Sequence, residues 1–172
     1  MAPRLVLIGS PGAGKTTVGR RVAERLKVPF ADSDHLIEAQ AGMPVSDIFV
    51  NSGEPAFREL EEQVIADALV QHAGVLSLGG GAVMRDATRD RLVGHRVVWL
   101  RVSLSDAAAR VGMNTARPLL LGNVRGTLAA LMEARNPVYE SVASAIVDTS
   151  GRSVREVVDL VADIATQEPA DE

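Results

Sequence analysis

The chain has 172 residues, which is long enough for one domain with a substantial hydrophobic core. Its 47% hydrophobic and 23% charged residues are typical of a globular protein, and its net charge of −4 argues against a nucleic-acid partner, which would favour a basic surface. The lack of cysteine excludes disulfides, thiolate metal sites and cysteine nucleophiles.

Short apolar runs alternate with helical patterns along the chain, an order typical of an α/β fold with a parallel sheet. We expect five strands, at residues 5–8, 28–34, 74–78, 95–102 and 144–149. Helices are expected at residues 15–27, within residues 53–72, and from Ser153, where a Ser-x-x-Glu capping box precedes regularly spaced valines.

Residues 1–172 are expected to form a single domain, because no linker or repeat divides them. Two segments, about 33–60 and 112–124, lie outside the alternation, and insertions of that kind often carry moving parts. No apolar run approaches the ~18 residues that span a bilayer, and the first apolar run leads into glycines rather than into a cleavage site. We therefore expect a cytoplasmic protein, without a membrane partner, that acts as a monomer.

The segment GSPGAGKT, residues 9–16, matches the phosphate-binding pattern G-x-x-x-x-G-K-[ST] between an expected strand and an expected helix. Its glycines let backbone N–H groups converge on an anion, and the following helix directs its positive end there. The expected nucleotide ligands are Gly12, Ala13, Gly14, Lys15, Thr16 and Thr17. Lys15 would reach the outer phosphates, and the Thr16 hydroxyl would bind Mg²⁺. The alternative is a glycine-rich turn that binds nothing.

The chain contains no N-K-x-D motif for guanine, since its only lysines are Lys15 and Lys27, and it is short for an ATPase motor. It favours a kinase that phosphorylates a small molecule. Asp32 and Asp34 follow the second strand and face the same way if the chain there is extended. One would serve Mg²⁺ through water and the other would accept a hydrogen bond from an attacking hydroxyl. The alternative is helix capping by Ser33 or Asp34.

Three glycines, residues 79–81, follow the third strand, at the edge where ligands of open α/β sheets bind. The alternative is a plain turn. At this point six segments in order resemble the motifs of the shikimate kinases: GSPGAGKTTVGRRVAERL, DSD, DIFVNSGEPAFRELE, LSLGGGAV, NTARPLL and RNPVYESVA. The resemblance covers nearly the whole chain, from residue 5 to about residue 150.

The resemblance implies a nucleoside-monophosphate-kinase-like P-loop fold, with a five-stranded parallel sheet flanked by helices, a helical insertion for the substrate and a lid. It also implies an activity: transfer of the γ-phosphate of ATP, bound with Mg²⁺, to the 3-hydroxyl of shikimate. This reaction belongs to the chorismate pathway to the aromatic amino acids.

The resemblance also implies roles for individual residues. It assigns the shikimate carboxylate to Arg58 and Arg135, whose guanidinium forks match two oxygens. Asp34 would meet the shikimate hydroxyl, and Asp32 would lie nearer the metal. The pocket wall would be Gly79, Gly80 and Gly81. For Arg58 the alternative is a surface pair with Glu54 or Glu62, and Glu61 is positioned to hold it.

Three further arginines are assigned to the nucleotide by the resemblance. Arg117, in NTARPLL, would belong to a lid and stabilise the phosphoryl group during transfer, the alternative being an exposed loop arginine. Arg110 and Arg152 would lie around the adenine. Two other functions remain open: a gluconate or nucleoside-monophosphate kinase, and a regulatory module that binds ATP without turnover. The DSD, GGG and NTARP segments argue against the first, and Asp34 argues against the second.

Overall fold

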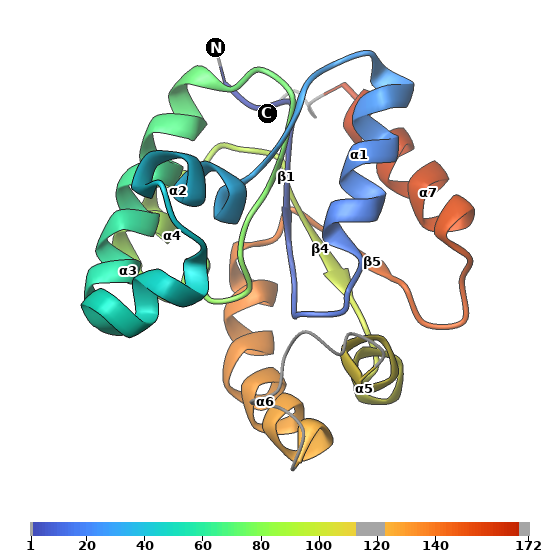
Figure 1. Ribbon diagram of the computed structural model, residues 1–172. Coiled ribbons are helices and arrows are strands. Elements are labelled where there is room, and N and C mark those ends of the chain that lie inside the picture. The colour runs from blue at the N-terminus through green and yellow to red at the C-terminus, as the bar shows by residue number, and fades with distance from the viewer. Residues whose placement is uncertain (1, 113–122, 169–172) are drawn as a thin grey trace.

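The chain folds as a five-stranded parallel sheet covered by helices on both faces (Figure 1). This computed structural model describes residues 2–112 and 123–168. The strands are β1 (Leu5–Ile8), β2 (Phe30–Asp32), β3 (Val75–Ser77), β4 (Val97–Arg101) and β5 (Ala145–Asp148). Their order is β2-β3-β1-β4-β5, and every pairing is parallel. Each strand lies within a predicted apolar run, so the predicted fold class is confirmed.

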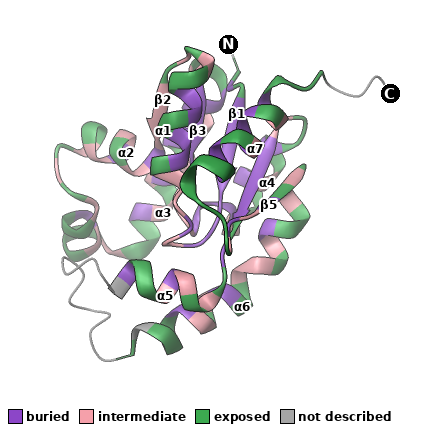
Figure 2. Cartoon of the chain, turned by 90° about the vertical axis from the view of Figure 1, so that its right-hand side faces the viewer, coloured by how far each residue is buried: buried purple, intermediate pink, exposed green. Residues whose placement is uncertain are grey.

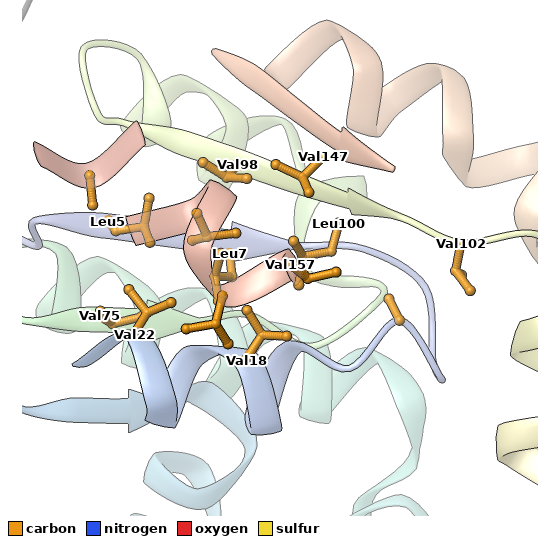
Figure 3. Packing of buried hydrophobic residues seen from close by; sticks show 14 of the residues in the cluster. Leu5, Leu7, Val18, Val22, Val75, Val98, Leu100, Val102, Val147 and Val157 are labelled. Atoms are coloured by element: carbon orange, nitrogen blue, oxygen red, sulfur yellow. The ribbon is translucent and has the colours of Figure 1, made fainter. Parts of the chain in front are cut away.

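The central strand β1 is buried on both faces because alternate side chains enter different halves of the core. Leu5 and Leu7 pack on one side, and Val6 and Ile8 pack on the other. All of them are at most 1% exposed. The first half of the core is shown in Figure 3, where β1, β3 and β4 contact the inward faces of α1 and α7.

The helices are α1 (Lys15–Leu26), α2 (Ser33–Ala41), α3 (Val45–Gln71), α4 (Asp86–Leu92), α5 (Leu104–Gly112), α6 (Val124–Val142) and α7 (Val154–Thr166), and Ala82–Met84 forms a 3₁₀ turn. Helices α1 and α7 lie side by side on one face, and α3 and α4 cover the other (Figure 1). Buried residues concentrate on the strands and on the inward helix faces (Figure 2). None of these helices, within the described ranges, has the length and apolarity that crossing a bilayer requires.

Local sequence accounts for the starts of two helical segments. Helix α7 starts after its predicted N-cap Ser153, whose hydroxyl accepts a hydrogen bond from the Glu156 N–H. Helix α3 is longer than predicted and is interrupted at Gly53, where φ is +81°. Pro55 follows in the first turn of the second part, where a missing N–H leaves no hydrogen bond unmade.

The segment at residues 33–60 is mostly helical, formed by α2 and the first part of α3. Its Ile37, Ile48 and Phe57 pack with Val64, farther along α3, in a small separate hydrophobic cluster. The expected lid at residues 112–124 falls largely outside the described residues, and so does Arg117. The helical segment lies at the carboxyl end of β2, where it forms one wall of the site described next.

Candidate active site

The phosphate loop, residues 9–16, connects β1 to α1 in a conformation that depends on glycine. Gly12 and Gly14 have φ values of +80° and +88°, the left-handed region that side chains disfavour. The Lys15 ammonium donates to the carbonyls of Gly9, at 2.7 Å, and Ser10, at 3.2 Å. Its charge is therefore held at the loop, beside the positive end of α1.

Asp32 connects the phosphate loop to α2. One of its carboxylate oxygens accepts a hydrogen bond from the Asp34 N–H at 2.9 Å and caps α2, so the cap is Asp32 rather than Ser33 or Asp34. The other oxygen accepts a hydrogen bond from the Thr16 hydroxyl at 3.3 Å. In the sequence, helix capping and a place beside the phosphate loop were alternative interpretations of this segment. In the structure Asp32 caps the helix and also contacts the phosphate loop. Ser33 accepts a hydrogen bond from the Gly79 N–H at 2.9 Å, which fixes α2 to the next strand's exit.

The Thr16 hydroxyl and the Asp32 carboxylate present oxygen atoms, which are the ligands that Mg²⁺ prefers. Mg²⁺ usually keeps several waters and binds one or two carboxylates together with substrate phosphates. Among the described residues no cluster of three or more histidine, aspartate or glutamate side chains forms a metal cage. The Thr16 hydroxyl and the Asp32 carboxylate fit a Mg²⁺ ion that is also bound by waters and substrate phosphates.

The glycine run, residues 79–81, is crowded by charged side chains from other elements. A methyl group placed on Gly79 would lie 3.0 Å from Asp34 Oδ1, and one on Gly80 would lie 3.1 Å from Arg135 Nη1. One on Gly81 would lie 2.6 Å from Arg58 Nη2, closer than a Cβ atom tolerates. The run is thus a seam along which three predicted site residues, Asp34, Arg58 and Arg135, converge.

Arg58 is held by a buried carboxylate. Its Nη1 lies 2.9 Å from Glu61 Oε1, and Glu61 is 2% exposed. Burial raises the pKa of Glu61 above its usual 4.5, the hydrogen bond and charge of Arg58 lower it, and the Asp34 carboxylate raises it further. Glu54 makes a weaker pair with Arg58 at 3.6 Å, whereas Glu62 pairs with Arg85 and Arg91. The principal partner is therefore the buried Glu61 and not either surface glutamate.

Two cavities adjoin along these elements. The first, about 490 Å³, lies over the phosphate loop, and the second, about 590 Å³, lies between the glycine run and α2 and α3. Both are lined by Pro11, Thr16, Asp32, Asp34, Gly79 and Gly80. Arg58 and Arg135 line the second cavity but not the first. A group bound in one cavity would therefore face a group bound in the other across a wall that includes two carboxylates.

A third, smaller cavity of about 170 Å³ lies beside the phosphate loop, at the start of α7. It is lined by Arg110 and Arg152, the two arginines that the resemblance assigns to the surroundings of the adenine. Arg110 also donates to the Gly12 carbonyl at 2.8 Å, so it braces the loop from outside.

Some residues of the site were not found from the sequence. Phe49 and Phe57 line the second cavity with ring centroids 4.5 Å apart, and neither was assigned to the site from the sequence. Ser33 received no role beyond possible capping. Their signal was weak because a side chain's place in a cavity depends on elements that meet only in the folded chain.

A parallel sheet in this order, with a phosphate loop after its central strand and a second cavity beside it, defines a P-loop protein with the nucleoside-monophosphate-kinase-like fold. A family model described as shikimate kinase matches residues 11–165. The chain belongs to the shikimate kinase family, a family of ATP-dependent kinases, and the family predicted from the motifs is confirmed.

Individual relatives agree with this membership. A shikimate kinase of Thermobifida fusca is 58% identical over 160 residues, covering 93% of each chain. The solved structure of an Acinetobacter baumannii shikimate kinase in complex with shikimate is 34% identical, with a TM-score of 0.88 over 95% of this chain and 92% of that one. A gluconokinase from Sinorhizobium meliloti is 20% identical, with a TM-score of 0.61 over 94% of this chain and 90% of that one, and shares the fold alone.

Proposed function

We propose that the chain transfers the γ-phosphate of ATP to the 3-hydroxyl of shikimate, giving shikimate 3-phosphate and ADP. The observation that carries this proposal is the shared wall of the two cavities: one side has a phosphate loop and the other has two arginines. Family membership and the shikimate bound to the Acinetobacter relative support the choice of acceptor.

In this proposal the phosphate loop holds the triphosphate. The N–H groups at Gly12, Ala13 and Gly14 and the Lys15 ammonium would offset its charge. The Ala13 N–H and the Lys15 ammonium, which donate to loop carbonyls in the structure, would exchange those partners for phosphate oxygens. Mg²⁺ would be held by the Thr16 hydroxyl and, through water, by Asp32, and would offset the charge that develops on the transferred group. Thr17, Arg110 and Arg152 line the adjoining small cavity and would hold the rest of the nucleotide.

The second cavity would hold the acid. Arg58 and Arg135 supply two guanidinium forks, each able to donate two parallel hydrogen bonds to a carboxylate. The side chain of Asp34 reaches both cavities, so a hydroxyl placed there can donate to its carboxylate and pass on its proton as the oxygen attacks the phosphoryl group. Gly79, Gly80 and Gly81 leave room for the ring to approach the backbone.

We also propose a single kinase domain at residues 1–172, with an acceptor-binding insertion at about 33–60 and a lid at about 112–124. Arg117, in the lid, would stabilise the phosphoryl group in transfer. The net charge of −4 supports a protein without a nucleic-acid partner. We propose that it acts in the cytoplasm as a monomer, away from membranes.

The test is a coupled assay of ADP release from Mg-ATP, with and without shikimate, and with gluconate and a nucleoside monophosphate as control acceptors. We expect shikimate alone to accelerate ADP release, with shikimate 3-phosphate as the product. Acceleration by gluconate or the monophosphate but not by shikimate would assign the chain to another small-molecule kinase. No acceleration by any acceptor would favour the binding module.

A further inference from the structure

Tyr139, on α6, is a buried side chain behind the glycine run. It is 0% exposed, and its ring packs against Trp99 of β4 with centroids 5.8 Å apart. Its hydroxyl donates to the carbonyl of Gly80, 59 residues earlier in the chain. The phenol is outside the set of side chains that line the second cavity, so it can influence that cavity only through the groups it contacts.

This hydrogen bond determines which way one peptide faces. In a trans peptide the carbonyl of one residue and the N–H of the next point in opposite directions, and the described residues contain no cis peptide. Because the Gly80 carbonyl points to the buried phenol, the Gly81 N–H points away from the core. Gly81 lines the second cavity beside the Arg58 guanidinium, so this N–H is directed to that side.

The same hydroxyl contacts three parts of the site, namely the glycine run at Gly80, α6 at Arg135 and the phosphate loop at Ser10. Burial raises the pKa of Tyr139 above its usual 10.0, whereas hydrogen bonding with the side chains of Arg135 and Ser10 lowers it. The phenol therefore remains a proton donor at neutral pH. Arg135 lies one helical turn before Tyr139 on α6, and a methyl group on Gly80 would lie 3.1 Å from its Nη1 and 3.3 Å from Pro11 Cδ.

We propose that Tyr139 is a positioning residue for the acid. Its hydroxyl orients the peptide that joins Gly80 to Gly81 and steadies Arg135, so that the Gly81 N–H is a fixed donor beside the two guanidinium groups. The inference rests on the proposed function, since it assumes that the second cavity binds shikimate. It adds Tyr139, a side chain outside the cavity, to the residues that orient the groups expected to bind the acid.

The variant Tyr139→Phe tests this, because it keeps the ring against Trp99 and removes only the hydroxyl. The Kd for shikimate, measured by calorimetry, should rise about tenfold, the effect of one lost hydrogen bond in a buried network. The Kd for Mg-ADP should change less than about twofold, because the loop's own contacts remain. The matched control is Trp99→Phe, which loosens the same ring contact, lowers the melting temperature and leaves the Kd for shikimate unchanged.

A second measurement needs no variant. In the unaltered protein the amide proton resonance of Gly81 should move on addition of shikimate, and a resonance that does not move overturns the proposal. An unchanged Kd in Tyr139→Phe also overturns it, as does an equal rise in Trp99→Phe, which would indicate a packing role. If the unaltered protein does not bind shikimate, the proposed function fails first and the inference fails with it.

Discussion

The phosphate loop and the glycine run lie at the ends of neighbouring strands, β1 and β3, yet they use glycine for different reasons. In the phosphate loop, Gly12 and Gly14 adopt positive φ values. In the glycine run, Gly81 has an ordinary φ of −98°. A side chain there would instead meet the Arg58 guanidinium, because Nη2 lies 2.6 Å from where a methyl group would be and would have to move.

The difference shows two routes to a ligand site. Backbone conformation shapes the phosphate loop, and that conformation is set by the loop's own residues. Side chains from α3 and α6 shape the glycine run, and they arrive from distant parts of the chain. Substitutions in the phosphate loop should therefore act through backbone strain, and substitutions in the glycine run should act through crowding of side chains. Four experiments test the roles of these two regions.

The largest effect is expected at Asp34, which lines the cavities on both sides. Asp34→Asn should lower kcat by about 10²–10⁴-fold, since the amide cannot accept the hydroxyl proton. Calorimetry should show nearly unchanged nucleotide binding. Asp67→Asn, on the exposed face of α3, is the matched control and should keep the kcat of the unaltered protein. A normal kcat in Asp34→Asn would remove this residue from the reaction.

Next in size is Gly81→Ala, which breaks the glycine run by crowding. Its new methyl group would displace Arg58, so the KM for shikimate should rise as much as in Arg58→Ala, by about 10- to 150-fold. The KM for ATP should not change. In the double variant Gly81→Ala/Arg58→Ala the two effects should not add, because the clash and its target act on one contact. Additive effects would show that Gly81 acts independently of Arg58.

A smaller effect is expected from Gly14→Ala, which breaks the phosphate loop by strain. The nearest atom to the new methyl group would be 3.8 Å away, so crowding is absent, but φ is +88°. The strain of about 1–2 kcal/mol should weaken nucleotide binding roughly tenfold and leave the Kd for shikimate unchanged. Gly14→Asn is the control, because asparagine tolerates this region better and should lose less affinity. Equal losses in both variants would point to a cause other than backbone strain.

The smallest effect concerns Glu61, the carboxylate behind the glycine run. Its pKa is raised in the folded protein, mainly by burial, so its favourable contribution to stability is complete below pH 4.5 and is lost as pH rises through the folded-state pKa. The melting temperature of Glu61→Gln minus that of the unaltered protein should therefore increase by up to a few degrees as the pH rises from 4.5 to 7.

Glu62→Gln is the control for this titration. Hydrogen bonds from Arg85 and Arg91 lower the pKa of Glu62, so its contribution is present at neutral pH and is lost as pH falls. The two variants should diverge from the unaltered protein in opposite directions as the pH changes. A parallel pH dependence in Glu61→Gln and the unaltered protein would contradict the raised pKa.

The sequence by itself determined the five strands, the start of α7 and the phosphate loop, because each is specified by residues close together in the chain. Apolar runs give buried strands, and GSPGAGKT carries both its glycines and its lysine within residues 9–16. The family followed from such local motifs. It named Arg58, Asp34 and Arg135 as site residues, and the structure brings them to one seam.

Only the tertiary structure decided what holds those residues. Ser33 meets Gly79 across 46 residues of sequence, and Tyr139 meets Gly80 across 59. The carboxylate of Glu61 lies 2.9 Å from Arg58 Nη1 and is buried, and burial is a property of the packed chain and not of sequence spacing. Local patterns encode backbone conformation, whereas contacts and solvent exclusion arise only when distant segments pack together.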